Sequence, residues 1–125
     1  MATISHERPS IIKSIFGRSQ VVIGVLHCPP LPGSPRFRDK DFKAAVDVAM
    51  KDAESYVSGG VDGLIIENHG DIPFLKPDRI GHETSAALAV IADRVRQRFS
   101  VPMGINVLAN AAIPALAVAK ASGAD

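Results

Sequence analysis

Near its middle the chain reads Gly59-Gly60-Val61-Asp62-Gly63-Leu64-Ile65-Ile66-Glu67-Asn68-His69-Gly70-Asp71. A double glycine commonly ends a helix, because glycine adopts the left-handed cap conformation at little cost. The apolar run Gly63–Ile66 is too short for a helix and has no polar alternation, so it predicts a strand covered on both faces. Such strands belong to parallel sheets wrapped by helices, in which ligands bind at the carboxyl ends of the strands. The polar residues after the run therefore stand where chemistry is expected.

The same pattern recurs on both sides of this stretch. Val21–Leu26 is β-branched and apolar, which predicts a strand, and it runs into His27. Gly104–Leu108 predicts a third strand. Between and after these strands, some segments have apolar residues at helical spacing and one is rich in alanine. These segments are predicted to be helices. These helices extend from a cap at Asp39 or Asp41 to Val57, from Thr84 to Phe99, and from Ala112 to Ala121 with Asn110 as N-cap.

Alternating strands and helices predict an α/β fold with a parallel sheet and right-handed crossovers. A closed eight-stranded barrel and a doubly wound open sheet both fit. No G-x-G-x-x-G follows the first strand and no G-x-x-x-x-G-K-[ST] occurs, which disfavours nucleotide binding of those types. Polar groups at the ends of all three strands favour a barrel mouth. We therefore predict a lead-in over residues 1–20 with a short helix at Ile11–Phe16, and a partial barrel over residues 21–125.

Composition narrows the class of protein. The 125 residues suffice for one modest domain, and a net charge of +1 with no Trp and one Tyr gives no sign of a nucleic-acid surface. The apolar runs are too short for an integral membrane segment. Cys28 is the single cysteine and cannot form an internal disulfide, which favours a reducing compartment. These features indicate a cytoplasmic protein.

Five polar residues are candidates for a small-molecule site. His27 suits a general acid or base, or a metal ligand, although it can equally fix the next loop. Glu67 and Asn68 are neighbours on a strand and point to opposite faces, so only one can face the barrel axis, and their spacing does not choose between them. Asp71 after Gly70 is also typical of a turn. Asn106 inside an apolar strand needs a partner for its amide. A catalytic pair of His27 and Glu67, with the other three orienting substrate, is one hypothesis.

A divalent cation is possible, but no ligand set with a recognised spacing is present. His27, Glu67, Asp71 and Asn106 follow different strands and could converge on an ion. Cys28 beside two prolines could be a nucleophile, although a lone cysteine is more often a small apolar filler. The loop from Cys28 to Pro35 holds four prolines and should be stiff and extended.

Three blocks of the sequence resemble signatures of the BtpA family. They are His27–Pro35, which matches H-x-x-PLPGSP; Gly60–Phe74, which is similar to GGVDG…ENFGDxPF; and Pro102–Asn110, which is similar to PxGxNVLxN. The resemblance implies a TIM-type barrel akin to the ribulose-phosphate-binding barrels, of which this chain is the amino-terminal half with three β/α units. The stretch Ser122–Asp125 matches Ser58–Asp62, which leads into the second strand, and therefore points into the start of a fourth strand. His69 stands where the family usually has an aromatic residue. Ala109 and Ala111 stand where many members carry Arg and Asp.

The resemblance implies two functions of different classes. One is a barrel enzyme acting on a small polar or phosphorylated metabolite. The other is a non-catalytic factor that assists photosystem I assembly, with photosystem I or a membrane surface as partner. We also expect an isolated half-barrel to expose apolar strand residues and two bare edges. Such a chain should aggregate or form a homo-oligomer through those edges.

Overall fold

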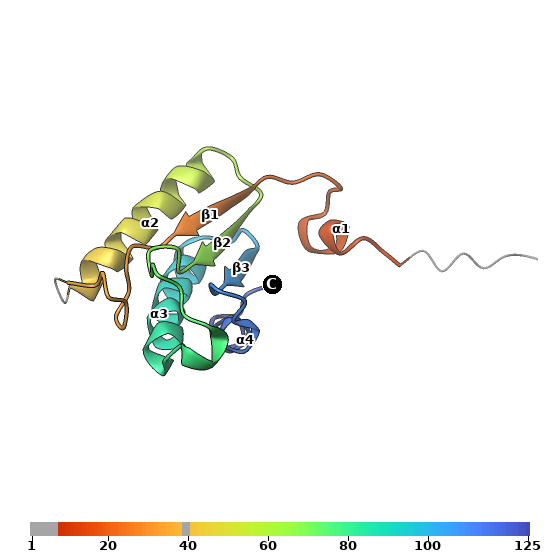
Figure 1. The fold of residues 1–125 in the computed structure, drawn as a ribbon. Coiled ribbons are helices and arrows are strands. Elements are labelled where there is room, and N and C mark those ends of the chain that lie inside the picture. Colours follow the sequence, from red (N-terminus) through yellow and green to blue (C-terminus); the bar gives the residue numbers. More distant parts are fainter. Residues whose placement is uncertain (1–7, 39–40) are drawn as a thin grey trace, which may run out of the picture.

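The computed structural model describes residues 8–38 and 41–125. The elements alternate along the chain after a short first helix (Figure 1). In order they are α1 (Ile11–Phe16), β1 (Ile23–His27), α2 (Phe42–Ser58), β2 (Gly63–Glu67), a 3-10 turn η1 (Pro77–Arg79), α3 (His82–Arg98), β3 (Met103–Asn106) and α4 (Ala112–Ser122).

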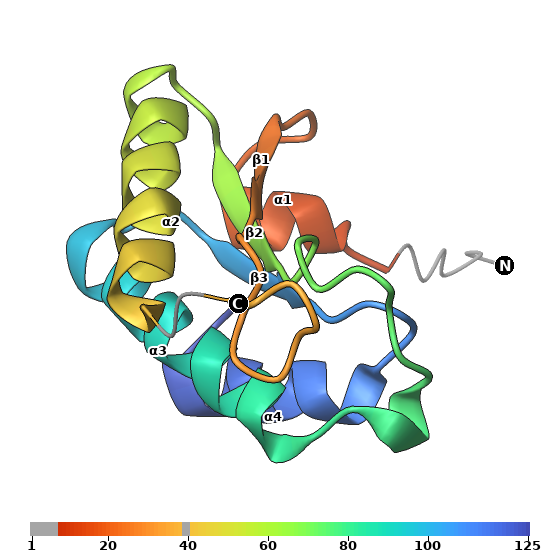
Figure 2. The same cartoon turned by 60° about the vertical axis from the view of Figure 1, so that its left-hand side comes forward.

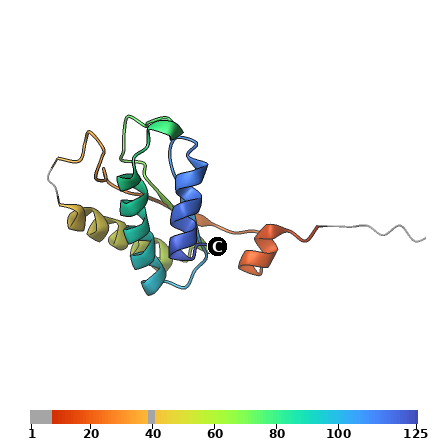
Figure 3. The same ribbon diagram turned by 90° about the horizontal axis from the view of Figure 1, so that it is seen from below.

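The three strands form one parallel sheet in the order β1-β2-β3. Helices α2, α3 and α4 lie along one side of this sheet, while α1 stands apart from them (Figures 1 and 3). Seen from another direction, α1 lies behind the strands (Figure 2). The predicted α/β class and parallel sheet are confirmed. The strands follow one another in sequence order, and the helix after each strand lies on the same side of the sheet. This arrangement is compatible with part of a barrel, whereas a doubly wound sheet carries helices on both faces.

The core lies between the sheet and these helices. Leu26 of β1 and Leu64 and Ile66 of β2 are at most 1% exposed. They belong to one apolar cluster with α3 residues such as Leu88 and Ile91. Each fully buried side chain of this size stabilises the fold by about 1.5–3 kcal/mol. The alternate residues of each strand point the other way, so the two faces of the sheet have different surroundings.

The second face of the sheet is partly covered by α1. Phe16 reaches Gly63, where a Cβ atom would lie 2.8 Å from the Phe16 ring. A hollow of about 220 Å³ remains between α1 and the strands, lined largely by apolar side chains such as Ile15 and Ile65. Val22, which precedes β1, and Ile23, its first residue, are 65% and 39% exposed. The expectation of exposed apolar strand residues therefore holds for these two, whereas the residues that face the helices are buried.

Asp62 and Asp125 each form a pair of hydrogen bonds with the backbone of a residue at or just before the start of a strand. Asp62 donates its N–H to Val22 O at 2.8 Å and accepts from Val22 N at 2.8 Å through its carboxylate. Asp125 repeats this with Met103, at 2.8 Å and 3.0 Å. The matching sequences around these aspartates thus form matching structures beside β1 and β3.

Several boundaries differ from the sequence-based expectation. The third strand ends at Asn106 and not at Leu108, because the Leu108 backbone bonds to the side chain of Asn68. The prediction of Asn110 as N-cap of α4 is wrong: the cap position is Ala111, and Asn110 has a left-handed φ of 57°. For α2 the cap is Asp41, which accepts from Ala44 N. The alternative cap, Asp39, lies outside the described residues.

Candidate functional site

Strand register brings three of the candidate residues into one row. His27 pairs with Glu67 across β1 and β2, and Glu67 pairs with Asn106 across β2 and β3. Residues paired in register point to the same face of a parallel sheet. This face is opposite to that of Leu26 and Ile66, which are buried. The row therefore lies at the carboxyl edge of the sheet, on the face away from α2, α3 and α4.

Glu67 stands at the centre of this row and is held from both sides. Asn106 Nδ2 donates to Glu67 Oε2 at 2.5 Å, and His27 Nε2 lies 3.6 Å from Glu67 Oε1. The Glu67 side chain is 13% exposed, against 55% for His27. Over residues 8–38 and 41–125, no Lys or Arg forms an ion pair with this carboxylate. Asn106 thus orients the carboxylate, and Oε1 is directed toward His27.

His69 joins the row from the loop after β2. Its ring stacks on His27 with 4.2 Å between centroids and 11° between planes, and Phe74 meets it edge-on at 6.2 Å. Ligand atoms of His27, Glu67 and His69 all lie within 4.8 Å of one another. Sequence reasoning placed His69 in the polar stretch after the second strand and noted it as a departure from the family pattern, but did not include it among the candidate site residues. The signal that could have found it is its position two residues after a strand-end carboxylate.

Asn68 and Asp71 are brought together in a second group. Asn68 is 2% exposed. Its side chain accepts from Leu108 N at 2.7 Å and donates to Leu108 O at 3.2 Å, and its amide also reaches Asp71 Oδ2 at 3.4 Å. Asp71 Oδ1 accepts from Leu31 N at 2.8 Å. These two residues therefore tie together the loops that follow the three strands, and with neighbouring loop residues they line a cavity of about 30 Å³.

The pKa of Asp71 and that of Cys28 are both raised, mainly by burial. Bonds from Leu31 and Asn68 oppose the shift at Asp71. Burial, with the nearby Asp71 carboxylate as a second cause, raises the pKa of the Cys28 thiol to about 12. Cys28 is 1% exposed and belongs to the apolar core. A thiol that stays protonated is a poor nucleophile, so the apolar-filler interpretation fits this residue.

Gly70 closes the loop against the proline-rich segment. Its N–H donates to Cys28 O at 3.0 Å. A Cβ atom at this position would lie 2.5 Å from backbone atoms of Pro29 and Pro30, so only glycine fits without a shift of the backbone. His69 thus stands between two neighbours that are held in place, Asn68 by the bonds of its side chain to Leu108 and Gly70 by its backbone contacts.

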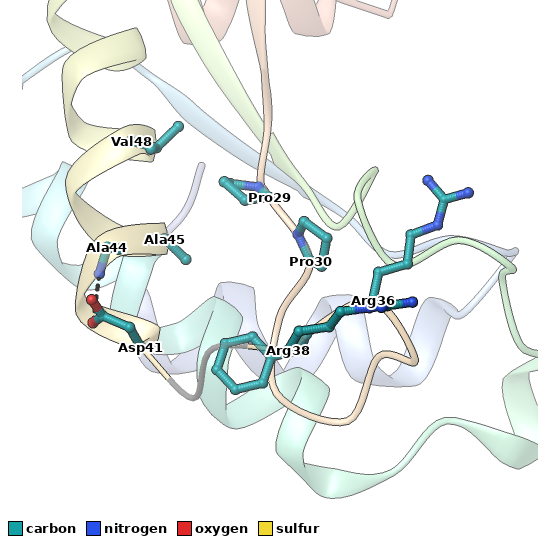
Figure 4. Close-up of a pocket in the computed structure, with 9 residues that line it drawn as sticks. Pro29, Pro30, Arg36, Arg38, Asp41, Ala44, Ala45 and Val48 are labelled. Carbon is teal, nitrogen blue, oxygen red and sulfur yellow. Dashed lines mark hydrogen bonds between the residues drawn. The ribbon is translucent and has the colours of Figure 1, made fainter.

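A separate hollow of about 250 Å³ lies between the proline-rich loop and the start of α2 (Figure 4). Pro29 and Pro30 line one side of it and Ala44 and Val48 line the other. Neither His27 nor Glu67 is among its lining residues. The row of strand-end residues is therefore distinct from this hollow.

Comparison with known proteins decides the family. A profile of the BtpA family matches residues 18–125. The chain belongs to the BtpA family. The predicted membership is thereby confirmed over most of the chain.

Relatives of this BtpA family chain occur in archaea, cyanobacteria and animals. An uncharacterised protein of Archaeoglobus fulgidus is 53% identical over 106 residues, which are 85% of this chain and 42% of that protein. The photosystem I biogenesis protein BtpA of Synechocystis is 43% identical over 109 residues, 87% of this chain and 37% of that protein. An uncharacterised mitochondrial protein of Caenorhabditis elegans is 34% identical over 124 residues, which are 95% of this chain and 44% of that protein.

The chain thus spans less than half the length of these relatives. No solved structure matches it. In the described part of the chain, none of the helices has the length and apolar character needed to cross a membrane.

Proposed function

We propose that this chain supplies part of the active site of a barrel enzyme that acts on a small polar or phosphorylated metabolite. The observation that carries the proposal is the row formed by His27, Glu67 and Asn106 at the carboxyl edge of the parallel sheet. Active sites of β/α barrels lie at this edge. The phosphorylated class of ligand is proposed because complete β/α barrels often hold phosphate in the loops after their seventh and eighth strands.

His27 and Glu67 are the proposed acid and base. Imidazole takes up and releases a proton near neutral pH, and a carboxylate accepts one. The 3.6 Å between Nε2 and Oε1 is longer than a good hydrogen bond, so each atom remains able to bond to a ligand. Asn106 holds the other carboxylate oxygen and thereby keeps Oε1 directed toward the ligand. One group can remove a proton from the ligand while the other donates a proton to it.

Asn106, Asn68 and Asp71 orient the substrate in this proposal. Asn106 is exposed beside Glu67 and can bond to a ligand directly. Asn68 and Asp71 act by holding the loops that border the site, since their side chains bond to Leu108 and Leu31.

The test uses the intact protein and a panel of phosphorylated pentoses and hexoses with their unphosphorylated counterparts. Binding is measured by thermal shift and turnover by NMR. We expect His27→Gln and Glu67→Gln to abolish turnover or the ligand-induced shift while the melting temperature without ligand stays nearly the same. The matched controls are His82→Gln and Glu54→Gln, both exposed side chains outside the row. Retained binding and turnover in both site variants would contradict the proposal.

A second candidate function is assistance to photosystem I assembly without catalysis. It is favoured by the name of the Synechocystis relative, a photosystem I biogenesis protein. The intact protein and its Glu67→Gln variant can be supplied to a Synechocystis strain that lacks this relative. Equal recovery of photosystem I with both versions would favour the non-catalytic function. Recovery of photosystem I with the unaltered protein alone would show that the effect requires the Glu67 carboxylate.

A further inference from the structure

We propose that His27, Glu67 and His69 bind a divalent transition-metal ion, with Zn²⁺ as the best fit. The three side chains come from β1, β2 and the loop after β2, and they meet at one place on the carboxyl edge of the sheet. Two imidazoles and one carboxylate form a donor set that suits zinc and its neighbours, whereas Mg²⁺ and Ca²⁺ prefer oxygen donors alone.

The distances are close to those that a tetrahedral ion requires. With metal–ligand bonds of about 2.0–2.1 Å, two ligand atoms of a tetrahedral site lie about 3.3 Å apart. His27 Nε2 and Glu67 Oε1 are 3.6 Å apart, and all three ligand atoms lie within 4.8 Å. Binding requires the exposed His69 ring to turn from its stacked position on His27 toward Glu67 Oε1.

The surroundings of Glu67 favour a cation. Its carboxylate is 13% exposed, and its ion-pair partner within the described segments is His27 alone. A shielded carboxylate is costly without a compensating positive charge. Asn106 occupies Oε2 with a hydrogen bond, which leaves Oε1 as the atom for the ion. This is the usual arrangement of a ligating carboxylate whose second oxygen is held by an outer partner.

The loop that carries His69 is also held in place. Asn68 is fixed by both backbone groups of Leu108, and Gly70 by its bond to Cys28 and by lack of room for a side chain. A binding constellation needs such support to keep its geometry. Three protein ligands leave a position of the zinc ion open to water or to a ligand, which is the pattern of catalytic sites. The proposal rests on the proposed function in that it uses the same two atoms, Nε2 of His27 and Oε1 of Glu67. With an ion bound, these atoms would be its ligands, and the ion would activate water or polarise the substrate in place of direct proton transfer by the two side chains.

The test measures metal binding itself and does not depend on turnover. The intact protein is prepared without a polyhistidine tag, treated with EDTA and titrated with Zn²⁺ by calorimetry. Co²⁺ serves as a second probe, because its visible absorption reports four-coordinate binding. We expect one ion per chain. Loss of a ligand should weaken binding by at least the roughly 10–100-fold seen when outer partners of metal ligands are removed.

The decisive variant is His69→Phe, which keeps an aromatic ring between His27 and Phe74 but removes the ligand nitrogen. Glu67→Gln removes the charge at nearly constant shape, and His82→Phe is the control for loss of a histidine elsewhere. Weaker Zn²⁺ binding and altered Co²⁺ absorption in the first two, with the control unchanged, would support the site. Absence of binding in the folded unaltered protein, or equal binding in all variants, would overturn it.

The two proposals fail separately. If His27→Gln and Glu67→Gln abolish turnover in a protein that binds neither ion, the acid–base function stands and the metal site is wrong. If Zn²⁺ binds through the three residues and no metabolite of the panel binds or reacts, the metal site stands and the proposed function is wrong.

Discussion

Replacement of Asn68 by alanine should destabilise the protein through the loop that follows β3. The Asn68 side chain is 2% exposed and bonds to both Leu108 N, at 2.7 Å, and Leu108 O, at 3.2 Å. Alanine would leave both backbone groups without these partners. A buried group that loses its partner costs about 1–3 kcal/mol, and Leu108 is half-buried, so we expect a loss of about 2–4 kcal/mol in the free energy of unfolding.

Urea denaturation of the intact protein, followed by circular dichroism, measures this loss. Hydrogen exchange of peptides that cover residues 107–111 provides a local measurement, because the Leu108 amide should exchange faster once Asn68 is removed. The matched control is Gln97→Ala. Gln97 is an exposed amide that bonds to Asp93 at 2.8 Å on the surface of α3. Surface changes of this kind usually alter stability by less than about 0.5 kcal/mol.

The reasoning would be refuted if Asn68→Ala and Gln97→Ala had equal effects on the free energy of unfolding. It would also be refuted if the exchange of the Leu108 amide were unchanged. A loss of about 2–4 kcal/mol is a large part of the ~5–15 kcal/mol typical of folded proteins, so the effect is well within measurement.

Two further predictions concern titratable groups. Because burial raises the pKa of Cys28 to about 12, its thiol should resist iodoacetamide at pH 8 in the folded protein and react once urea unfolds it; equal rates in both states would contradict this. Hydrogen bonds from Arg96 and Met103 lower the pKa of Asp125 below its ordinary value of 3.8. The ionised carboxylate therefore stabilises the fold above pH 3.8, and this contribution is lost as the pH falls through the lowered pKa. The difference in unfolding free energy between the unaltered protein and Asp125→Asn should shrink over that range; a difference independent of pH would contradict the assignment.

Much of the fold follows from local sequence. The apolar run at Gly63–Ile66 has no polar alternation and forms the central strand, in which Leu64 and Ile66 are buried and Ile65 is half-buried. Gly17 ends α1 in the left-handed conformation, as a glycine after a short helical run predicts. Boundaries were less accurate where a side chain distant in the sequence intervenes. Leu108 leaves the sheet because Asn68, forty residues earlier, binds its backbone.

The candidate site was predictable in part. The sequence placed His27 and Glu67 at the ends of strands, since each follows an apolar run. It placed Asn106 inside the third strand, whereas the structure ends that strand at Asn106. It could not choose between Glu67 and Asn68 for the open face, because their alternation with apolar neighbours is symmetrical. It also gave no reason to join His69 to the row, because that contact depends on the path of a loop.

The sequence by itself determined the alternation of strands and helices, the family and the positions of the polar strand ends, because these depend on local periodicity and on short motifs. Only the tertiary structure decided that Glu67 lies on the face of the sheet away from α2, α3 and α4, and that its neighbour Asn68 bonds to the loop after β3. Strand register and helix packing set those directions. They arise from contacts between residues about forty positions apart in the chain, such as His27 with Glu67 and Asn68 with Leu108.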